Sequence, residues 1–548
     1  MLSSRLPKDL SPSPFFAELE RAKADVLAKC ENSEALPFID MTVSSPLRVG
    51  LPFDLAPAID EAKAEFGTWV ADAAGRRNAR EAVVEYYRER GGNFTAGQII
   101  LTASTSEAYS VLFKTFCDPG DVILTPMPGY PLLDTLAQLE HLECTPYFLK
   151  LKREIATSAA HSRNDKSASS LSQHSPCMSL RGAPDESGSA MSTQACTQHS
   201  PCMSLRGAHD SSAQLCQPAS SLSQHSPCLS LRAQSAKQSK ANAVFRYVLD
   251  TDSLLAAPER AKILLLVSPH NPTGHCVSRE EWNAAVRFCE ENDMILVVDE
   301  VFGDYAFSDK VTRTWQYVLD EGTLAGSLQT RDERENVILD RREGEQSHLN
   351  VEPEIASSAV HSRNDNVEQE NDAFWDAGGG DFVNLPEDGP KCPIFWLNGL
   401  SKAVGSPQLK LGWMAFYAPR DKFEEIRAAL EFVEDAYLSV SAPAQSLARP
   451  MLAASAVYEL RIRERLSTNW QTLREAFPSK YCPEVLGGWY AVVRLGEDDE
   501  EITLRLLREK HVLVQPGFFF DFDEDGWVVI SLLQEPAIFK EAILRILQ

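Results

Sequence analysis

The order strand, helix, strand between residues 263 and 299 constrains the fold of this chain more than any other feature. Ile263–Ser268 is predicted to be a strand buried on both faces, because its apolar run is continuous. A predicted helix at Arg279–Asn292 follows, and then a second apolar strand at Met294–Val298. Two strands joined by a crossover helix run parallel, so the sequence predicts an α/β fold whose site lies at the carboxyl edge of a mostly parallel sheet.

Composition and charge exclude several classes of protein. The 548 residues are 44% hydrophobic and 9% aromatic, as expected for a globular protein with a large core. A net charge of −25 argues against nucleic acid or an anionic membrane as a main partner. No apolar run reaches the length of a membrane span, and the N-terminus lacks the apolar core of a signal peptide.

Twelve cysteines are present without a Cys-x-x-Cys pair or zinc-ligand spacing. We therefore expect neither a disulfide framework nor a metal site, and a reducing compartment such as the cytoplasm fits best.

Two segments have the composition of disordered insertions. Residues 155–242 contain 22 serines and no aromatic residue, and residues 326–390 are rich in acids. Such sequences cannot bury enough apolar surface to offset the entropy of ordering. A Gln-His-Ser-Pro-Cys unit begins at 173, 198 and 224, and a second cassette occupies 154–165 and 354–365. The spacing is too irregular for a solenoid, so we expect repeats carried in surface loops.

The chain is expected to form three regions. Residues 1–50 would form an N-terminal arm that joins the small domain, residues 51–415 would form the large domain, and residues 416–548 would form a small α+β domain. Helices and further strands are predicted at Phe15–Cys30, Phe38–Ser45, Ala79–Arg90, Asp421–Ala436, Ala442–Gln471, Trp489–Arg494, His511–Val514 and Trp527–Leu533.

Two loops after predicted strands offer groups that suit a planar, phosphorylated ligand. A strand ends at Thr102 and a helix begins within Ser104–Ser106, where hydroxyls and unpaired N–H groups could hold a phosphate. A plain helix N-cap explains the same residues. After the strand at 121–125, Tyr130 stands between a glycine and a proline, where its ring could face a planar ligand or simply anchor the loop.

Three polar residues follow the next strands. Asn271 lies in Pro-His-Asn-Pro-Thr-Gly, and Asp299 ends the strand that begins at Met294. Lys402 stands in a turn-rich loop after the apolar run Ile394–Leu397. A lysine with a lowered pKa can form a Schiff base with a carbonyl. Taken singly, a solvated lysine and a solvated loop acid explain Lys402 and Asp299 equally well.

In this order, the segments resemble the class I/II aminotransferases, which are pyridoxal-phosphate enzymes of fold type I. The most specific elements are Ser268–Gly274, Val298–Glu300 and Gly399–Trp413. The resemblance covers essentially everything outside the two insertions. It implies a mostly parallel sheet flanked by helices, a smaller α+β domain and a homodimer.

The resemblance also implies a role for each residue. Lys402 would form the Schiff base with pyridoxal 5'-phosphate and then move the α-proton of the substrate. Asp299 would face the pyridine nitrogen, Asn271 would hydrogen-bond the phenolic oxygen, and Tyr130 would stack on the ring. The phosphate would be held by Ser104, Thr105, Ser106 and Ser401.

Four positions depart from the family pattern or match it loosely. Phe302 replaces a tyrosine that usually shares the phenolic oxygen, and Lys410 replaces an arginine that usually binds the phosphate with a planar fork. Val529 stands where the substrate-carboxylate arginine is expected, two residues before Ser531. Trp69 matches the aromatic residue that reaches the phosphate from the partner subunit.

The sequence thus predicts a cytoplasmic aminotransferase that exchanges an amino group between an amino acid and a 2-oxo acid. Two other functions fit the same motifs. One is a lyase that eliminates from the β-carbon, including C–S cleavage. The other is a sensor that binds the cofactor or an amino acid without catalysis.

Overall fold

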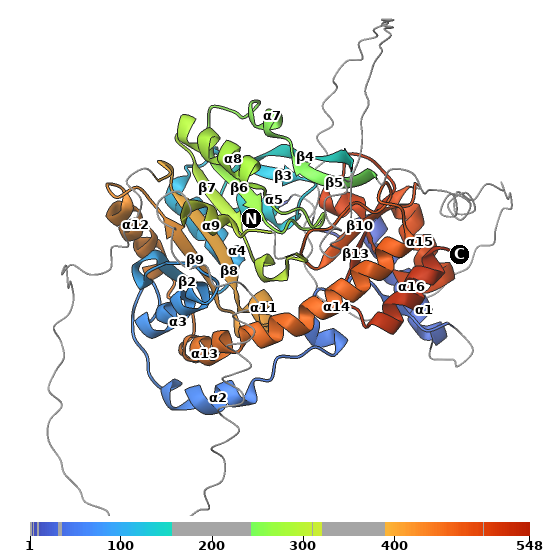
Figure 1. Cartoon of the computed structure of the whole chain (residues 1–548), viewed down its shortest axis with the longest axis horizontal. Coiled ribbons are helices and arrows are strands. Elements are labelled where there is room, and N and C mark those ends of the chain that lie inside the picture. Colours follow the sequence, from blue (N-terminus) through green and yellow to red (C-terminus); the bar gives the residue numbers. More distant parts are fainter. Residues whose placement is uncertain are drawn as a thin grey trace, which may run out of the picture.

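The computed structural model describes residues 3, 5–7, 10–30, 36–155, 243–308, 311–319, 389–496 and 498–548 (Figure 1). The insertions predicted at 155–242 and about 326–390 fall outside these residues except at their edges. Ile155 ends a long strand, β4 (Glu143–Ile155), and Pro390 accepts a hydrogen bond of 2.9 Å from the Tyr417 hydroxyl. None of the helices formed by the described part of the chain is long and apolar enough to cross a bilayer.

Within the described residues, eight strands form the central sheet in the spatial order β2-β9-β8-β7-β6-β3-β4-β5. The pairs from β8 through β4 are all parallel, whereas β9 and β5 run antiparallel to their neighbours. The predicted mostly parallel sheet is therefore confirmed. Besides β4, the strands are β2 (Ile99–Thr102), β3 (Val122–Met127), β5 (Ala243–Leu249), β6 (Ala261–Val267), β7 (Ile295–Asp299), β8 (Ile394–Gly399) and β9 (Gly412–Tyr417).

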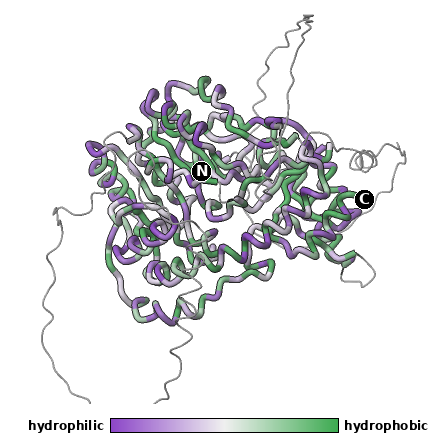
Figure 2. Tube along the Cα trace, viewed as in Figure 1, coloured by the Kyte–Doolittle hydropathy of each residue, from purple (hydrophilic) through white to green (hydrophobic). Residues whose placement is uncertain are grey.

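Alternate residues of each central strand enter two different hydrophobic cores, one on each face of the sheet. In β6, Ile263 and Leu265 belong to one core and Leu264 and Leu266 to the other. Both faces are buried, which is why these strands read as continuous apolar runs. Figure 2 shows the resulting hydrophobic interior between more polar outer helices. One face packs on α4 (Thr105–Phe116), α5 (Leu132–Leu139) and α12 (Phe423–Asp435), and the other on α3 (Arg77–Arg88), α8 (Arg279–Glu291) and α13 (Ala442–Ala453).

The C-terminal region and the N-terminal arm pack together beside this sheet (Figure 1). Strands β10 (Tyr490–Arg494), β13 (Trp527–Ser531) and β12 (Gln515–Pro516) form an antiparallel sheet in that order. The strand predicted at Phe38–Ser45 is only β1 (Ile39–Asp40), because its register with β11 (Val512–Leu513) covers two residues. The helices here are α1 (Pro14–Cys30), α15 (Asp499–Lys510) and α16 (Pro536–Ile546).

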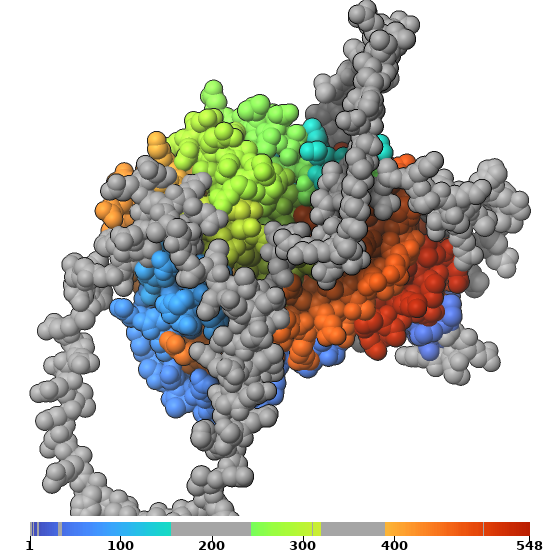
Figure 3. Space-filling view, viewed as in Figure 1, coloured from blue at the N-terminus to red at the C-terminus, as the bar shows by residue number. Residues whose placement is uncertain are grey.

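The helical stretch predicted at Ala442–Gln471 is two helices, α13 and α14 (Ser455–Ala476). They meet at Ala454, and the Ser455 hydroxyl donates to the Leu452 carbonyl at 2.6 Å and accepts from Arg90, which fixes the junction. Figure 3 shows α14 in orange across the face of the molecule. The remaining short elements are η1 (Pro46–Val49), α2 (Ala56–Ala62), η2 (Lys63–Glu65), η3 (Ala96–Gln98), α7 (Thr251–Leu254), η4 (Gly303–Tyr305), α9 (Thr314–Leu319), α11 (Leu400–Ala403), η5 (Pro407–Leu409) and η6 (Gly517–Phe520).

Candidate active site

Most of the residues singled out in the sequence follow strands that end at the same edge of the central sheet. Strands β3, β6, β7 and β8 are parallel, and β2 runs with them because both β2 and β8 are antiparallel to β9. The turn after β6 is tied to β7 by a 2.9 Å hydrogen bond from the Ser268 N–H to the Asp299 carbonyl. Their carboxyl ends therefore bring together the segments that carry Ser104, Tyr130, Asn271, Asp299 and Lys402.

Lys402 lies on α11, directly after β8, and its amine is close to two aromatic rings. Its Nζ is 4.7 Å from the centre of the Trp489 ring and 5.3 Å from that of Phe302. Its carbonyl accepts a hydrogen bond of 2.5 Å from the Tyr305 hydroxyl. Burial lowers the pKa of Lys402 to about 8, against the opposing effect of the Asp299 charge. Near pH 7 about a tenth of the amine is then neutral and nucleophilic, far more than for a lysine with the ordinary pKa.

Asp299 ends β7 with both carboxylate oxygens engaged. The Tyr109 hydroxyl donates to Oδ2 at 2.6 Å, and the N–H of Val301 donates to Oδ1 at 3.0 Å. Burial raises the pKa of this carboxyl, whereas these two hydrogen bonds and the charge of Lys402 lower it. Asp299 is therefore an interior acid beside the lysine, and the solvated loop acid considered from sequence does not describe it.

The helix start at Ser104 forms the N-cap expected from the sequence. Ser104 Oγ accepts the N–H of Glu107 at 3.2 Å, and α4 begins at Thr105. A Cβ at Gly412 would lie 3.1 Å from the carbonyl carbon of Ser104, so glycine lets β9 approach this turn closely. The N-cap is thus confirmed, and phosphate binding by the first N–H groups of the helix stays a prediction.

The loops that carry Asn271 and Tyr130 lie at the same edge. The side-chain oxygen Oδ1 of Asn271 is buried and lacks a hydrogen-bond partner among the described residues. Tyr130 is 47% exposed, and its neighbour Gly129 donates its N–H to the Phe520 carbonyl at 2.8 Å. An unsatisfied buried amide is costly, so a ligand that bonds to Asn271 would be favoured.

Three other predicted residues lie differently. Ser401 stands beside Lys402 on α11. Lys410 is exposed, with a φ of 53° in the left-handed region after η5. Trp69 is 72% exposed, and no contact recorded for the described residues joins it to Lys402. Its role at the site of a partner subunit stays a prediction.

The position where the family pattern places an arginine is buried among apolar residues. Val529 lies in β13 opposite Val492 of β10, and neither side chain is exposed. On the same face of this sheet, Tyr490 stands opposite Ser531 and its ring is 6.1 Å from that of Phe302. This wall of the site is therefore aromatic and aliphatic where a carboxylate clamp was expected.

A buried network of charges supports the turn after Asp299. Glu300 accepts from Arg313 Nε at 2.8 Å, and Asp304 accepts from Arg313 Nη1 at 2.9 Å, from Arg90 Nε at 3.0 Å and from the Tyr86 hydroxyl at 2.7 Å. Burial raises the pKa of Asp304, but the two guanidinium groups outweigh it and lower that pKa to about 2. These paired charges fix η4, and with it Tyr305, against Lys402.

Sequence reasoning missed three residues of this site: Tyr109, Tyr305 and Trp489. Tyr109 sits in the middle of a helix, where nothing in the local pattern distinguishes a core tyrosine from one that bonds to an acid on another strand. Trp489 follows two glycines before a predicted strand, and this Gly-Gly-aromatic start was the one available signal. The Trp489 indole N–H is buried without a partner in the described part of the chain.

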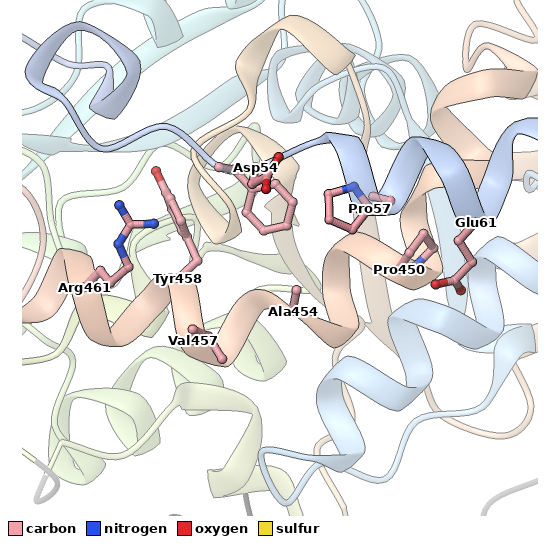
Figure 4. Close-up of a pocket in the computed structure, with 10 residues that line it drawn as sticks. Asp54, Pro57, Glu61, Pro450, Ala454, Val457, Tyr458 and Arg461 are labelled. Carbon is pink, nitrogen blue, oxygen red and sulfur yellow. The ribbon is translucent and has the colours of Figure 1, made fainter. Parts of the chain in front are cut away.

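A separate hollow of about 310 Å³ lies between α2 and the junction of α13 and α14 (Figure 4). Phe53, Pro57 and Val457 give it an apolar lining, and Asp54 and Arg461 bring charge to it. None of the residues that line it is among the predicted site residues.

Comparison with known proteins shows which family the chain belongs to. The model of the family "Aminotransferase class I and II" matches residues 59–166, 223–334 and 371–546. The alanine aminotransferase of Mycobacterium tuberculosis is 21% identical over 276 residues, which is 48% of each chain. The tyrosine aminotransferase of Bos taurus is 30% identical over 150 residues, 26% of this chain and 32% of the relative. The matches thus span about half or less of the length of these relatives.

Solved structures show the same fold. An aminotransferase from Escherichia coli aligns with a TM-score of 0.60 at 14% identity, covering 100% of this chain and 97% of its own. The aspartate aminotransferase of Thermotoga maritima aligns with a TM-score of 0.59 at 16% identity, covering 100% of this chain and 99% of its own. At such identities the likeness concerns the fold, while the family model covers well over half of the sequence. The chain belongs to the class I and II aminotransferase family.

Proposed function

We propose that this chain is a pyridoxal-phosphate-dependent aminotransferase that exchanges an amino group between an amino acid and a 2-oxo acid. The observation that carries the proposal is the pairing of a lysine and an acid at one sheet edge. Lys402 has its pKa lowered to about 8, and Asp299 lies close enough for its charge to act on that pKa. The cysteine pattern fits a reducing compartment, and on that ground we place the activity in the cytoplasm.

The residues present fit the cofactor. Lys402 would bind its aldehyde covalently, and Asp299 would pair with its ring nitrogen. The buried Oδ1 of Asn271, which lacks a partner among the described residues, would accept a hydrogen bond from its phenolic hydroxyl. Tyr130 would cover its ring. The phosphate would be held by the start of α4, with Ser104, Thr105, Ser106, Ser401 and Lys410.

When bound, the cofactor supplies an electrophilic aldehyde and an electron-withdrawing ring. The protein supplies the proton transfer, for which Lys402 Nζ takes a proton from the α-carbon of the substrate and returns it. Burial of this nitrogen beside Phe302 and Trp489 lowers its pKa to about 8, so it gives up its proton more readily than an exposed lysine does. Phe302 adds no hydroxyl, so Asn271 alone of these two positions would bond to the phenolic oxygen.

A spectral half-reaction screen tests the proposal. The purified protein is loaded with pyridoxal phosphate and mixed with one amino acid at a time, and its absorbance is followed. We expect at least one amino acid to convert the lysine-bound cofactor to its amine form, and a 2-oxo acid to reverse the change. Lys402→Ala should lose the lysine-bound band. Release of pyruvate and ammonia without any 2-oxo acid would instead identify a lyase, and a stable band with no donor would identify a sensor.

The proposed enzyme is a homodimer in which Trp69 reaches the phosphate of the partner's site. The high exposure of Trp69 and the 53% exposure of Val70 support this arrangement, since large apolar side chains favour burial in an interface. Mixed dimers test it. Lys402→Ala and Trp69→Ala subunits, each inactive alone, should regain activity when combined, because one site in each mixed dimer then carries neither change. Failure to complement would exclude shared sites.

A further inference from the structure

The carboxylate of Asp299 is held from two directions, and one of the two donors is a tyrosine on a separate helix. The Tyr109 hydroxyl donates to Oδ2 at 2.6 Å, whereas the other oxygen accepts the N–H of Val301 from its own loop. We propose that Tyr109 is a positioning residue, which fixes the orientation and the negative charge of Asp299 toward the ring nitrogen of the cofactor. This inference rests on the proposed function.

Tyr109 is itself rigidly placed. Its side chain is 4% exposed and lies in the core that α4 shares with the central sheet, with its ring 6.1 Å from that of Phe113. Buried side chains in packed cores keep one rotamer, so the hydroxyl cannot swing away from Asp299 without disturbing that core. The hydrogen bond is therefore a fixed part of the site.

The same helix begins at the proposed phosphate site. Ser104 caps α4, and Tyr109 follows it by five residues, which at 1.5 Å per residue is about 7.5 Å along the axis. One rigid element thus carries the phosphate-binding turn at its start and the partner of Asp299 in its second turn. Through α4, the two anchoring points of the cofactor would keep a constant separation.

The surroundings keep the proton on Tyr109, and the hydrogen bond from Tyr109 favours the ionised form of Asp299 against the effect of burial. Burial, then the charge of Asp299, raise the pKa of Tyr109 well above its ordinary value, so its hydroxyl keeps the proton that it donates. The other groups that act on this pair are Lys402 from α11, Glu300 beyond β7 and Tyr147 from β4. Because Tyr109 adds no positive charge, it orients Asp299 without a cation that would compete with the ring nitrogen for the carboxylate.

Loss of the hydroxyl should leave one oxygen of a buried carboxylate without a donor. The hydrogen bond to Tyr109 lowers the pKa of Asp299 against the effect of burial, so removing the bond raises that pKa further. A larger share of the protein would then carry a neutral acid, which does not stabilise a protonated ring nitrogen. Cofactor affinity should fall before any amino acid is added.

The experiment compares Tyr109→Phe with Tyr147→Phe in the full-length protein. Tyr147 is a matched control, since it is 2% exposed and lies near Tyr109, but its hydroxyl donates to the Leu265 carbonyl at 2.8 Å and not to Asp299. The dissociation constant of pyridoxal phosphate is measured by fluorescence quenching of the cofactor-free protein. We expect Tyr109→Phe to weaken binding about tenfold, as loss of an outer partner of a ligating group does, and Tyr147→Phe to change it less than about twofold. Equal losses in the two variants would overturn the inference.

A double-mutant cycle shows whether Tyr109 acts through Asp299. In an Asp299→Asn background, Tyr109→Phe should cause no further loss of cofactor affinity. An additional tenfold loss would mean that Tyr109 acts independently of the acid, which contradicts the proposed role. In addition, Tyr109→Phe alone should lower kcat more than it changes KM for the amino donor. A change confined to KM would count against a role at the ring nitrogen.

Incorporation of 3-fluorotyrosine at position 109 covers the case in which Tyr109→Phe does not fold. The fluorinated phenol is a stronger hydrogen-bond donor of nearly the same shape, so the protein that carries it should bind the cofactor more tightly than wild type. Weaker binding would overturn the inference. If wild-type protein binds no pyridoxal phosphate, the proposed function fails and this inference fails with it. If wild type binds and Tyr109→Phe binds equally well, only the role of Tyr109 is refuted.

Discussion

Replacing Lys402 by methionine should stabilise the cofactor-free protein at neutral pH. Burial lowers the pKa of Lys402 from 10.5 to about 8, so the folded protein holds the charged amine less favourably than the unfolded chain does. At pH 7 this difference corresponds to about 3 kcal/mol of lost stability. The charged amine also gains about 1 kcal/mol from the Trp489 and Phe302 rings, which methionine forgoes. The expected net gain for Lys402→Met is therefore about 2 kcal/mol.

The sign of the pH dependence follows from the same shift. Between the folded pKa of about 8 and the unfolded value of 10.5, the unfolded chain binds more protons, so the stability of wild type rises with pH over this interval. The variant has no such group. Its advantage should be complete below about pH 7 and should disappear above about pH 10.5.

Equilibrium urea unfolding followed by tryptophan fluorescence measures both quantities. Lys410→Met is the matched control, since Lys410 is exposed and its replacement should change stability by less than about 0.5 kcal/mol. The reasoning is refuted if Lys402→Met is less stable than wild type at pH 7. It is also refuted if the difference between the two proteins does not shrink as pH rises, because the cost of burying the charged amine would then not be its cause.

Three further outcomes follow from single contacts. Asn271→Ala should cost the cofactor-free protein little stability, because Oδ1 has no partner to lose among the described residues, yet weaken pyridoxal phosphate binding about tenfold, which urea unfolding and fluorescence quenching measure separately. Ser104 caps α4 and Ser278 caps α8, so Ser104→Ala and Ser278→Ala should each lower the free energy of unfolding by about 1 kcal/mol. Only Ser104→Ala should also weaken the binding of inorganic phosphate, measured by its competition with the cofactor. Val529→Arg should destabilise the protein by more than about 3 kcal/mol, because it would bury a guanidinium at a fully buried position opposite Val492. A stable variant in thermal unfolding would contradict this packing.

The strand-helix-strand pattern was enough to predict a mostly parallel sheet, and the order of the motifs placed the candidate site residues at its carboxyl edge. The continuous apolar run Ile263–Leu266 predicts a strand buried on both faces. Asp299 ends the next parallel strand and therefore lies at the carboxyl edge of the same sheet. The helix start at Ser104 was also predictable, because capping depends on neighbouring residues in the chain. Local and periodic patterns of this kind can be read from the sequence without knowledge of the tertiary structure.

Contacts across long sequence distances were not predictable in the same way. The helical stretch at Ala442–Gln471 reads as continuous, but packing around Arg90 and Ser455 divides it at Ala454. The strand predicted at Phe38–Ser45 is cut to two residues by its partner β11. In both cases, an element's limits were decided by a segment hundreds of residues away.

The sequence by itself determined that the chain has a parallel sheet with a lysine, an acid and an amide at its carboxyl edge, because periodicity and turn chemistry are local properties. Only the tertiary structure decided the electrostatic state of these groups. The pKa of Lys402 depends on its burial beside the Phe302 and Trp489 rings, which come from the turn after β7 and from the residue before β10. The orientation of Asp299 depends on Tyr109, which is 190 residues away in the chain. Desolvation and hydrogen-bond geometry arise from packing, and no local pattern of residues encodes them.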